Sequence, residues 1–115
     1  MTRDRLPKGV ITMVILTALW DREGYGYSLQ REVERITGQP LSRGEVYSML
    51  RHLEIRGFVE KVQVKEGKGR RSYYKTTGRG REFLIAQEKS MNTSLGILEY
   101  LKRFIATQRP KAEFK

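Results

Sequence analysis

A capped helix followed at once by a glycine-rich hairpin is the feature that most limits how this 115-residue chain can fold. Ser42 and Glu45 have the S-x-x-E spacing of a capping box, in which each side chain satisfies a backbone donor of the first helical turn. The helix predicted from this start runs to Gly57. Its expected inward stripe consists of Val46, Met49, Leu50 and Leu53.

After this helix the hydrophobic period changes from helical to alternating, which indicates β-strands. Residues 72–76 predict a returning strand, and the six residues 66–71 before it form a turn rich in glycine and in basic side chains. The sequence therefore predicts a β-hairpin with a basic tip. Its outgoing strand is marked by Phe58, Val59, Val62 and Val64.

Two helices are predicted upstream of the capped one. Pro7 suits the first turn of a helix, and residues 10–20 are apolar almost all round, interrupted only by Thr12 and Thr17. A helix without a polar face must be covered on both sides, and so short a chain has little with which to cover it. We therefore expect a partner subunit on its outer side. A second helix follows the glycines near residue 25 and ends at Gly38, with Leu29, Val33 and Ile36 facing inward.

The C-terminal third predicts one long helix. It begins with Thr77 as its cap and continues to about Thr107, before Pro110. Apolar residues recur at heptad spacing, but Glu88 and Lys102 fall on seam positions, so we expect packing against a partner helix and not a continuous zipper. The expected division of the chain is a DNA-binding domain over 1–76, a dimerisation helix over 77–109 and a disordered tail over 110–115.

Charge and composition narrow the function. Lys and Arg total 23 against 13 Asp and Glu, which gives a net charge of +10 and a pI near 10.2, as expected of a phosphate-binding protein. The chain has no cysteine and a single histidine, His52, so thiolate or imidazole metal sites are excluded, and we expect no cofactor. The apolar run is too short to cross a bilayer and lacks a cleavage site, which favours a cytoplasmic protein without membrane contact.

The order helix, helix, capped helix, hairpin is that of a winged helix-turn-helix, so the expected fold is mostly α with a small β-hairpin wing and a long C-terminal dimerisation helix. In this arrangement the third helix enters the major groove of double-stranded DNA and the wing lies along the backbone. The expected contacts of the third helix are Ser42, Arg43, Gly44, Tyr47, Ser48 and Arg51. Those of the wing are Lys65, Lys68, Arg70 and Arg71, and those of the second helix with the DNA backbone are Tyr25, Tyr27 and Ser28.

A homodimer interface is expected where the apolar positions of the first and last helices have no cover. It consists of Val10, Val14, Trp20, Leu84, Met91, Leu95, Leu98, Leu101 and Ile105. Trp20 and Met91 have an alternative interpretation as the lining of an effector pocket. Tyr47 could equally be a half-buried packing residue, and for Tyr25 and Tyr27 packing is slightly favoured.

The motifs, taken together, resemble the PadR-like regulators over roughly residues 8 to 84. The resemblance rests on residues 15–19, on the Gly-Tyr-Gly-Tyr step at 24–27, on the capped helix, on the wing at 67–74 and on 77–80. It implies a dimer in which the last helix packs with the first helix and with the partner subunit. It also implies repression by operator binding, sometimes relieved by a small aromatic or cationic compound near the dimer interface. A single helix after the wing resembles the short branch of the family.

Three other function classes stay open at this point. An enzyme is disfavoured because the carboxylates are scattered and no Ser/His/Asp set or phosphate loop is present. A non-specific architectural or RNA-binding module would explain the charge equally well. A protein-interaction adaptor could use the same fold without binding DNA.

Overall fold

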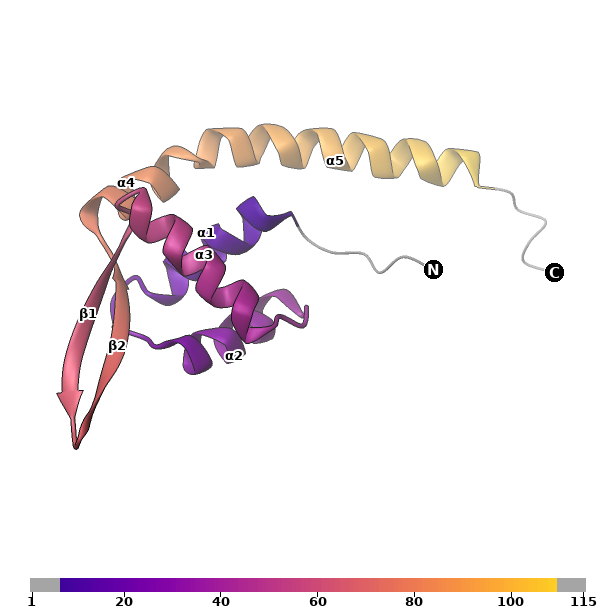
Figure 1. Ribbon diagram of the computed structural model, residues 1–115. Helices are drawn as coiled ribbons and strands as arrows, with labels where there is room; N and C mark the ends of the chain where they lie inside the picture. Colours follow the sequence, from indigo (N-terminus) through magenta and orange to yellow (C-terminus); the bar gives the residue numbers. More distant parts are fainter. Residues whose placement is uncertain (1–6, 110–115) are drawn as a thin grey trace. The chain divides into compact units, whose positions relative to one another are not determined.

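The computed structural model describes residues 7–109 (Figure 1). The expected disordered tail, 110–115, lies outside the described residues. The chain divides into two compact units, an N-terminal unit that continues to Leu84 and a C-terminal unit from Ile85 onward. The elements are α1 (Lys8–Ala18), α2 (Gly26–Thr37), α3 (Arg43–Ile55), β1 (Val59–Glu66), β2 (Gly69–Thr76), α4 (Gly78–Ala86) and α5 (Glu88–Gln108). This is the expected fold class, mostly helical with a two-stranded wing and a long C-terminal helix.

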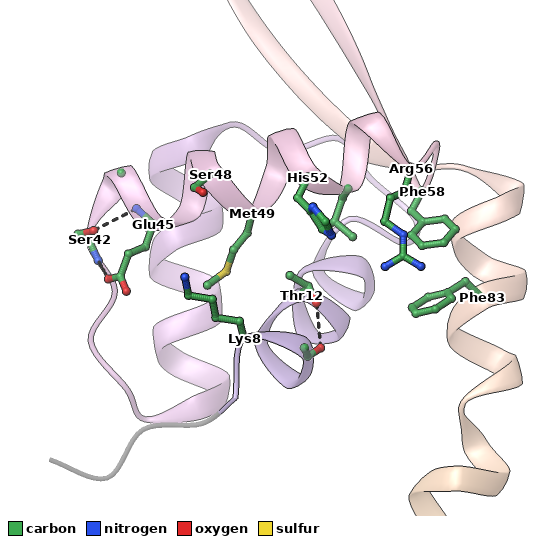
Figure 2. Close-up of a pocket in the computed structure, with 13 residues that line it drawn as sticks. Lys8, Thr12, Ser42, Glu45, Ser48, Met49, His52, Arg56, Phe58 and Phe83 are labelled. Carbon is green, nitrogen blue, oxygen red and sulfur yellow. Dashed lines mark hydrogen bonds between the residues drawn. The ribbon is translucent and has the colours of Figure 1, made fainter. Parts of the chain in front are cut away.

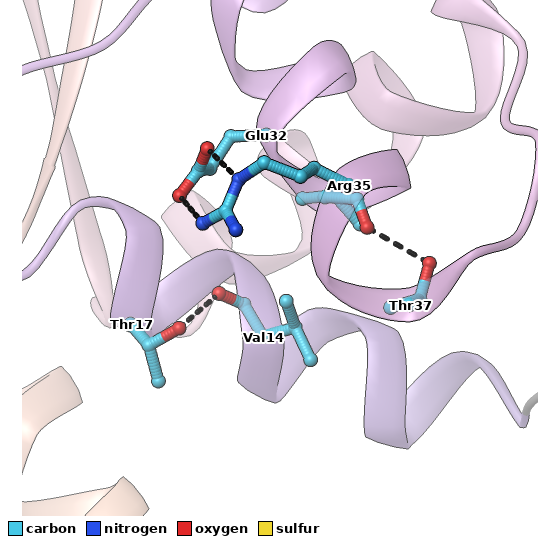
Figure 3. A network of polar contacts seen from close by, with 6 residues as sticks. Val14, Thr17, Glu32, Arg35 and Thr37 are labelled. Atoms are coloured by element: carbon cyan, nitrogen blue, oxygen red, sulfur yellow. Dashed lines mark hydrogen bonds and ion pairs between the residues drawn. The ribbon is translucent and has the colours of Figure 1, made fainter.

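Helix α1 buries one side of its apolar run. Ile15 and Leu16 are fully buried in the core, whereas Val10 keeps 38% of its surface exposed. The two polar residues of the run are satisfied within the helix. Thr12 donates to the carbonyl of Gly9 at 2.8 Å. Thr17 donates to the carbonyl of Val14 at 2.7 Å (Figure 3). The outer side of α1 is therefore compatible with burial, and its coverage by a partner stays a prediction.

Helix α2 ends where the sequence indicates, because Gly38 adopts the left-handed conformation with φ of 68°. The inward orientation predicted for Ile36 is wrong: its side chain is 45% exposed, and Leu41, after the helix, joins the core instead. On the outer surface Arg35 donates to Glu32 at 2.7 Å, and this hydrogen bond lowers the pKa of the Glu32 carboxyl (Figure 3).

The capping box of α3 is formed as predicted. The hydroxyl of Ser42 accepts from the backbone N–H of Glu45 at 3.0 Å, and the Glu45 carboxylate accepts from the N–H of Ser42 at 3.0 Å. All four residues of the predicted inward stripe are buried, and they are Val46, Met49, Leu50 and Leu53. One edge of α3 is thus held against the core while the rest of its surface stays available.

The wing, formed by β1 and β2, is longer and its turn is tighter than predicted. The register pairs Val59 with Thr76 and continues to Glu66 with Gly69, which leaves only Gly67 and Lys68 in the turn. Gly67 has φ of 60°, a conformation that glycine adopts without a steric penalty. The prediction that residues 66–71 form the turn is wrong because the basic residues at its end continue the strand.

The base of the wing is fastened to the helices by hydrogen bonds. Thr76 donates from its hydroxyl to the carbonyl of Leu16 at 2.8 Å, in a buried position. Thr77 accepts from the N–H of Gly80 at 3.0 Å and so caps α4 as predicted. A side chain at Gly80 would overlap the carbonyl of Phe58, so α4 packs there by direct contact of backbone.

The single helix expected over 77–109 is two helices. Gln87, with φ of −81° and ψ of −9°, separates α4 from α5. The sequence has no Gly or Pro at this place, so the break had no local signal. No residue of α5 is buried, and its exposed apolar residues are Met91, Leu95, Ile97, Leu98, Tyr100, Leu101, Phe104 and Ile105. Over residues 7–109, no helix combines the length and apolar character needed to span a bilayer.

Candidate nucleic-acid interface

The six residues expected to contact DNA from α3 all lie on its surface. Arg43, Tyr47 and Arg51 follow one another at spacings of four and therefore share one stripe of the helix. Gly44 and Ser48 lie beside that stripe and line a hollow described below. The structure thus brings the expected residues together along α3 but divides them between two neighbouring stripes.

The Arg43 end of the stripe is supported by α2. The guanidinium of Arg43 lies 5.8 Å from the centre of the Tyr27 ring. The guanidinium of Arg31 lies at the same distance, 5.8 Å, from that ring centre and donates a hydrogen bond to the Tyr27 hydroxyl at 3.3 Å. Tyr27 therefore gathers two arginines at the place where α2 approaches the start of α3. Its side chain is 48% exposed, so this cluster is open to solvent.

From the sequence, Tyr47 could be either a half-buried packing residue or an exposed contact residue. In the structure its side chain is partly packed and partly exposed. Its side chain is 44% exposed, and its hydroxyl lies against Gly26, where any Cβ atom would overlap it. The glycine of the Gly-Tyr-Gly-Tyr step therefore allows Tyr47 to lie across the first turn of α2. The ring is packed at one edge and accessible at the other.

The second-helix residues are engaged with the protein itself. Ser28 donates its hydroxyl to the carbonyl of Tyr25 at 2.9 Å and accepts from the Tyr25 N–H at 3.4 Å, which closes the first turn of α2. The ring of Tyr25 meets Tyr73 of the wing edge to face, with centroids 5.7 Å apart. A contact of Tyr25 or Ser28 with DNA stays a prediction.

The wing tip concentrates positive charge without balancing it. Lys65 and Arg70 lie directly opposite each other in the register, and Lys68 occupies the turn. Like charges placed opposite each other destabilise a strand pair. An anion at the tip would relieve this repulsion. Arg71 differs from these residues, because the hydrogen bond with Tyr73 and the charge of Glu66 raise its pKa.

A hollow of about 660 Å³ runs along α3 between the start of α1 and Phe83 of α4 (Figure 2). At one end Phe58 stacks on Phe83 with centroids 4.4 Å apart, and the guanidinium of Arg56 lies 4.8 Å from the centre of the Phe58 ring. This group was not expected from the sequence, because Phe83 is 25 residues beyond Phe58 and the three residues share no motif.

This hollow differs in its lining from the effector pocket that the sequence suggested, and that pocket stays a prediction. Trp20 does not line it, and the guanidinium of Arg81 lies 5.0 Å from the centre of the Trp20 ring. Met91 belongs to the C-terminal unit.

His52 is exposed and lines the hollow. Between residues 7 and 109 no group of three or more His, Cys, Asp or Glu side chains could hold a metal ion.

The residues expected at a dimer interface differ in burial. Val14 and Leu84 are partly buried against the core, and Trp20 is half-buried. The others are exposed, and they are Val10, Met91, Leu95, Leu98, Leu101 and Ile105.

Comparison with known proteins identifies the family of the chain. The model of the transcriptional regulator PadR-like family matches residues 15–86. A protein of transposon Tn4556 from Streptomyces fradiae is 34% identical over 79 residues, which are 69% of this chain but only 22% of that protein. A protein of Lysinibacillus sphaericus is 26% identical over 73% of this chain and 80% of its own length.

Solved structures have the same fold. A candidate transcriptional regulator from Thermoplasma acidophilum superposes with a TM-score of 0.75 and 31% identity, over 83% of this chain and 92% of that one. A PadR family regulator from Eggerthella lenta superposes with a TM-score of 0.72 and 26% identity, over 82% of each chain. PadR of Bacillus subtilis, solved with operator DNA, superposes with a TM-score of 0.60 and 24% identity, over 67% of this chain and 45% of that one. This is a likeness of fold alone. Since the family model covers more than half of its length, the chain belongs to the PadR-like family of transcriptional regulators.

Proposed function

We propose that this chain binds a specific sequence of double-stranded DNA as a homodimer and represses transcription from the promoter that it occupies. The observation that carries the proposal is the exposed stripe of Arg43, Tyr47 and Arg51 on a capped helix. Arginine can donate two parallel hydrogen bonds to the edge of a guanine in the major groove, which reads the base directly. Membership of the family supports this assignment.

The wing supports the second part of the interface. Its unbalanced Lys65, Lys68 and Arg70 would lie beside the sugar-phosphate backbone, where they add affinity and fix orientation but do not read sequence. Each phosphate contact releases a bound counterion, so the affinity depends on salt concentration. For the intact protein we therefore expect the logarithm of the affinity to fall steeply with the logarithm of the salt concentration.

The homodimer is inferred from the apolar surfaces that have no cover. Leu95, Leu98 and Leu101 of α5 are exposed, and so is Val10 of α1. Side chains of this size rarely remain in water as a group on a monomeric protein. A two-fold dimer would present two copies of α3, so the operator is expected to be pseudo-palindromic with half-sites about 34–36 Å apart or a multiple of that distance. A small-molecule effector at the dimer interface stays a prediction.

Selection of bound duplexes from a random pool tests the proposal. We expect a pseudo-palindromic consensus that the protein prefers over random duplex by about a thousandfold or more at fixed salt. Arg43→Ala and Arg51→Ala should each relax one position of the consensus, at about 1–3 kcal/mol if the contact is bidentate. Arg22→Ala, an exposed arginine outside α3 and the wing, is the matched control.

Two results would replace the proposal. Equal affinity for every duplex would assign the protein to the non-specific architectural class. Absence of DNA binding even at low salt would leave the protein-interaction adaptor as the function.

A further inference from the structure

The wing has a connection to α2 that the proposed DNA contacts do not require. Gly24, just before α2, exchanges two backbone hydrogen bonds with Tyr74 of β2, at 2.9 and 2.7 Å. This antiparallel bridge makes the next residue, Tyr25, a cross-strand neighbour of Tyr73. The chain preceding α2 is thus attached to β2 of the wing by one bridge.

Arg71 completes this connection from the wing. Its guanidinium lies 4.6 Å from the centre of the Tyr25 ring, closer than Arg43 or Arg31 approach Tyr27. Glu66 lies 3.7 Å from the guanidinium and accepts a hydrogen bond from the Tyr73 hydroxyl at 3.2 Å. The guanidinium is therefore held between an aromatic face and a carboxylate.

Alternation along the strands separates Arg71 from the other wing cations. Side chains two residues apart share a face, so Arg71 and Tyr73 lie on one face of the wing and Arg70 on the other. Glu66, two residues after Val64, which pairs with Arg71, shares the face of Arg71. Lys65, which pairs with Arg70, shares the face of Arg70. Over residues 7–109, no ion pair or ring contact involves Arg70.

Tyr25 transmits the position of the wing to the rest of the unit. It precedes the first residue of α2, and its backbone is tied to the Ser28 hydroxyl. Helix α2 in turn packs on α3, and Tyr47 of α3 lies against Gly26, the residue after Tyr25. A path of direct contacts therefore runs from Arg71 through Tyr25 to the exposed stripe of α3.

We propose that Arg71 and Tyr25 are positioning residues that fix the wing relative to α3, and that Arg71 is not one of the phosphate contacts. This inference rests on the proposed DNA binding, and it revises the DNA contacts expected of both residues from the sequence. The wing cations that meet phosphate are then Lys65, Lys68 and Arg70. Arg71 acts through Tyr25 to hold them in register with the groove.

A double-mutant cycle on affinity for the selected duplex separates positioning from phosphate contact. Arg71→Gln and Tyr25→Leu should each weaken binding about two- to fivefold, the range expected for an exposed cation–aromatic contact. In the Tyr25→Leu background, Arg71→Gln should have almost no further effect, because its partner is already absent. An equal effect of Arg71→Gln in both backgrounds would overturn the inference and make Arg71 an independent phosphate contact.

Conservative variants provide the rescue. Tyr25→Phe keeps the ring and should bind like the wild type, whereas a loss equal to that of Tyr25→Leu would show that the hydroxyl contacts DNA and would also overturn the inference. Arg71→Lys keeps the charge but not the planar group, so it should behave like Arg71→Gln. Retained wild-type affinity in Arg71→Lys would count against the inference.

Backbone hydrogen exchange of the wing in the free, full-length protein tests the anchor without DNA. Arg71→Gln and Tyr25→Leu should accelerate exchange in β1 and β2, while Arg70→Gln and Tyr25→Phe should not, at unchanged thermal unfolding. Unchanged exchange in all four variants would overturn the anchor alone. If no variant and no wild-type protein bound DNA, the proposed function would fail while the exchange result still stood.

Discussion

Leu50 of α3 and Leu98 of α5 are the same amino acid on amphipathic helices, yet the first is 0% exposed and the second 55%. The N-terminal unit closes its core with its own helices and the base of the wing. The described part of the C-terminal unit consists of the end of α4 and of α5, and no residue of α5 is buried. The central core of the first unit is therefore buried within that unit, whereas the apolar stripe of α5 is exposed.

The largest expected effect is on assembly. Leu98→Glu should prevent dimer formation or make the protein insoluble, because an unpaired charge in a buried interface costs about 3–5 kcal/mol. Light scattering of the full-length chain measures the result. Thr93→Glu, away from the heptad positions of α5, is the matched control and should leave the dimer intact. A stable dimer of Leu98→Glu would mean that α5 is not covered by its twin.

The next effect is on the core of the N-terminal unit. Leu50→Ala should lower the free energy of unfolding by about 2–5 kcal/mol, because it removes buried methyl groups and leaves a cavity. Urea unfolding followed by circular dichroism gives the value, with the exposed Glu54→Ala as control. A loss below about 1 kcal/mol would show that the core relaxes around the gap, and the contrast with α5 would weaken.

A glycine substitution should destabilise the N-terminal unit by a smaller amount. In Gly80→Ala the new methyl group would meet the carbonyl of Phe58 and the methyl of Thr76, so α4 must move. We expect a loss of about 1–3 kcal/mol, as for other overpacked sites. Thermal unfolding measures it, and an unchanged midpoint would mean that α4 shifts at little cost.

A glycine-to-alanine substitution in α5 should instead increase stability, and its effect should be the smallest of the four. Gly96 lies inside the helix, and apart from its chain neighbours and the adjoining helix backbone no atom lies within 4 Å of the position that an added methyl group would occupy. Gly96→Ala should therefore stabilise α5 by about 0.5–1 kcal/mol. Helicity and thermal midpoint of the dimer give the readout. A destabilised dimer would place a partner helix close to Gly96, off the expected seam.

The sequence predicted those parts of the fold that local physics decides. The Ser42–Glu45 cap and the stripe after it belong to one helix, so they were readable before any tertiary contact was known. Thr77 and Gly38, as cap and terminator, follow the same logic. The family resemblance, carried by such local motifs, is confirmed by the family model.

The missed features depend on contacts between distant segments. Ile36 has the spacing of an inward residue but is exposed, whereas Leu41, beyond the end of the helix, is buried in the core. Arg71 lies beside Arg70 in the sequence and so received the same role, and only the register of the wing separates them. The DNA contacts themselves stay predictions, since exposure alone does not show which stripe of α3 meets the groove.

The bridge from Gly24 to Tyr74 has a consequence for solubility. It pairs the edge of β2 at Tyr74, whereas among residues 7–109 no strand pairs with the outer edge of β1, which therefore presents its backbone donors and acceptors. Such an edge can recruit strands from other molecules and start aggregation. Here the exposed residues of β1 are largely charged, among them Glu60, Lys61 and Lys65. Charged side chains on an exposed edge strand disfavour its pairing with the same strand of another copy. At high concentration the molecules can therefore associate through their helices without forming intermolecular β-sheet through their wings.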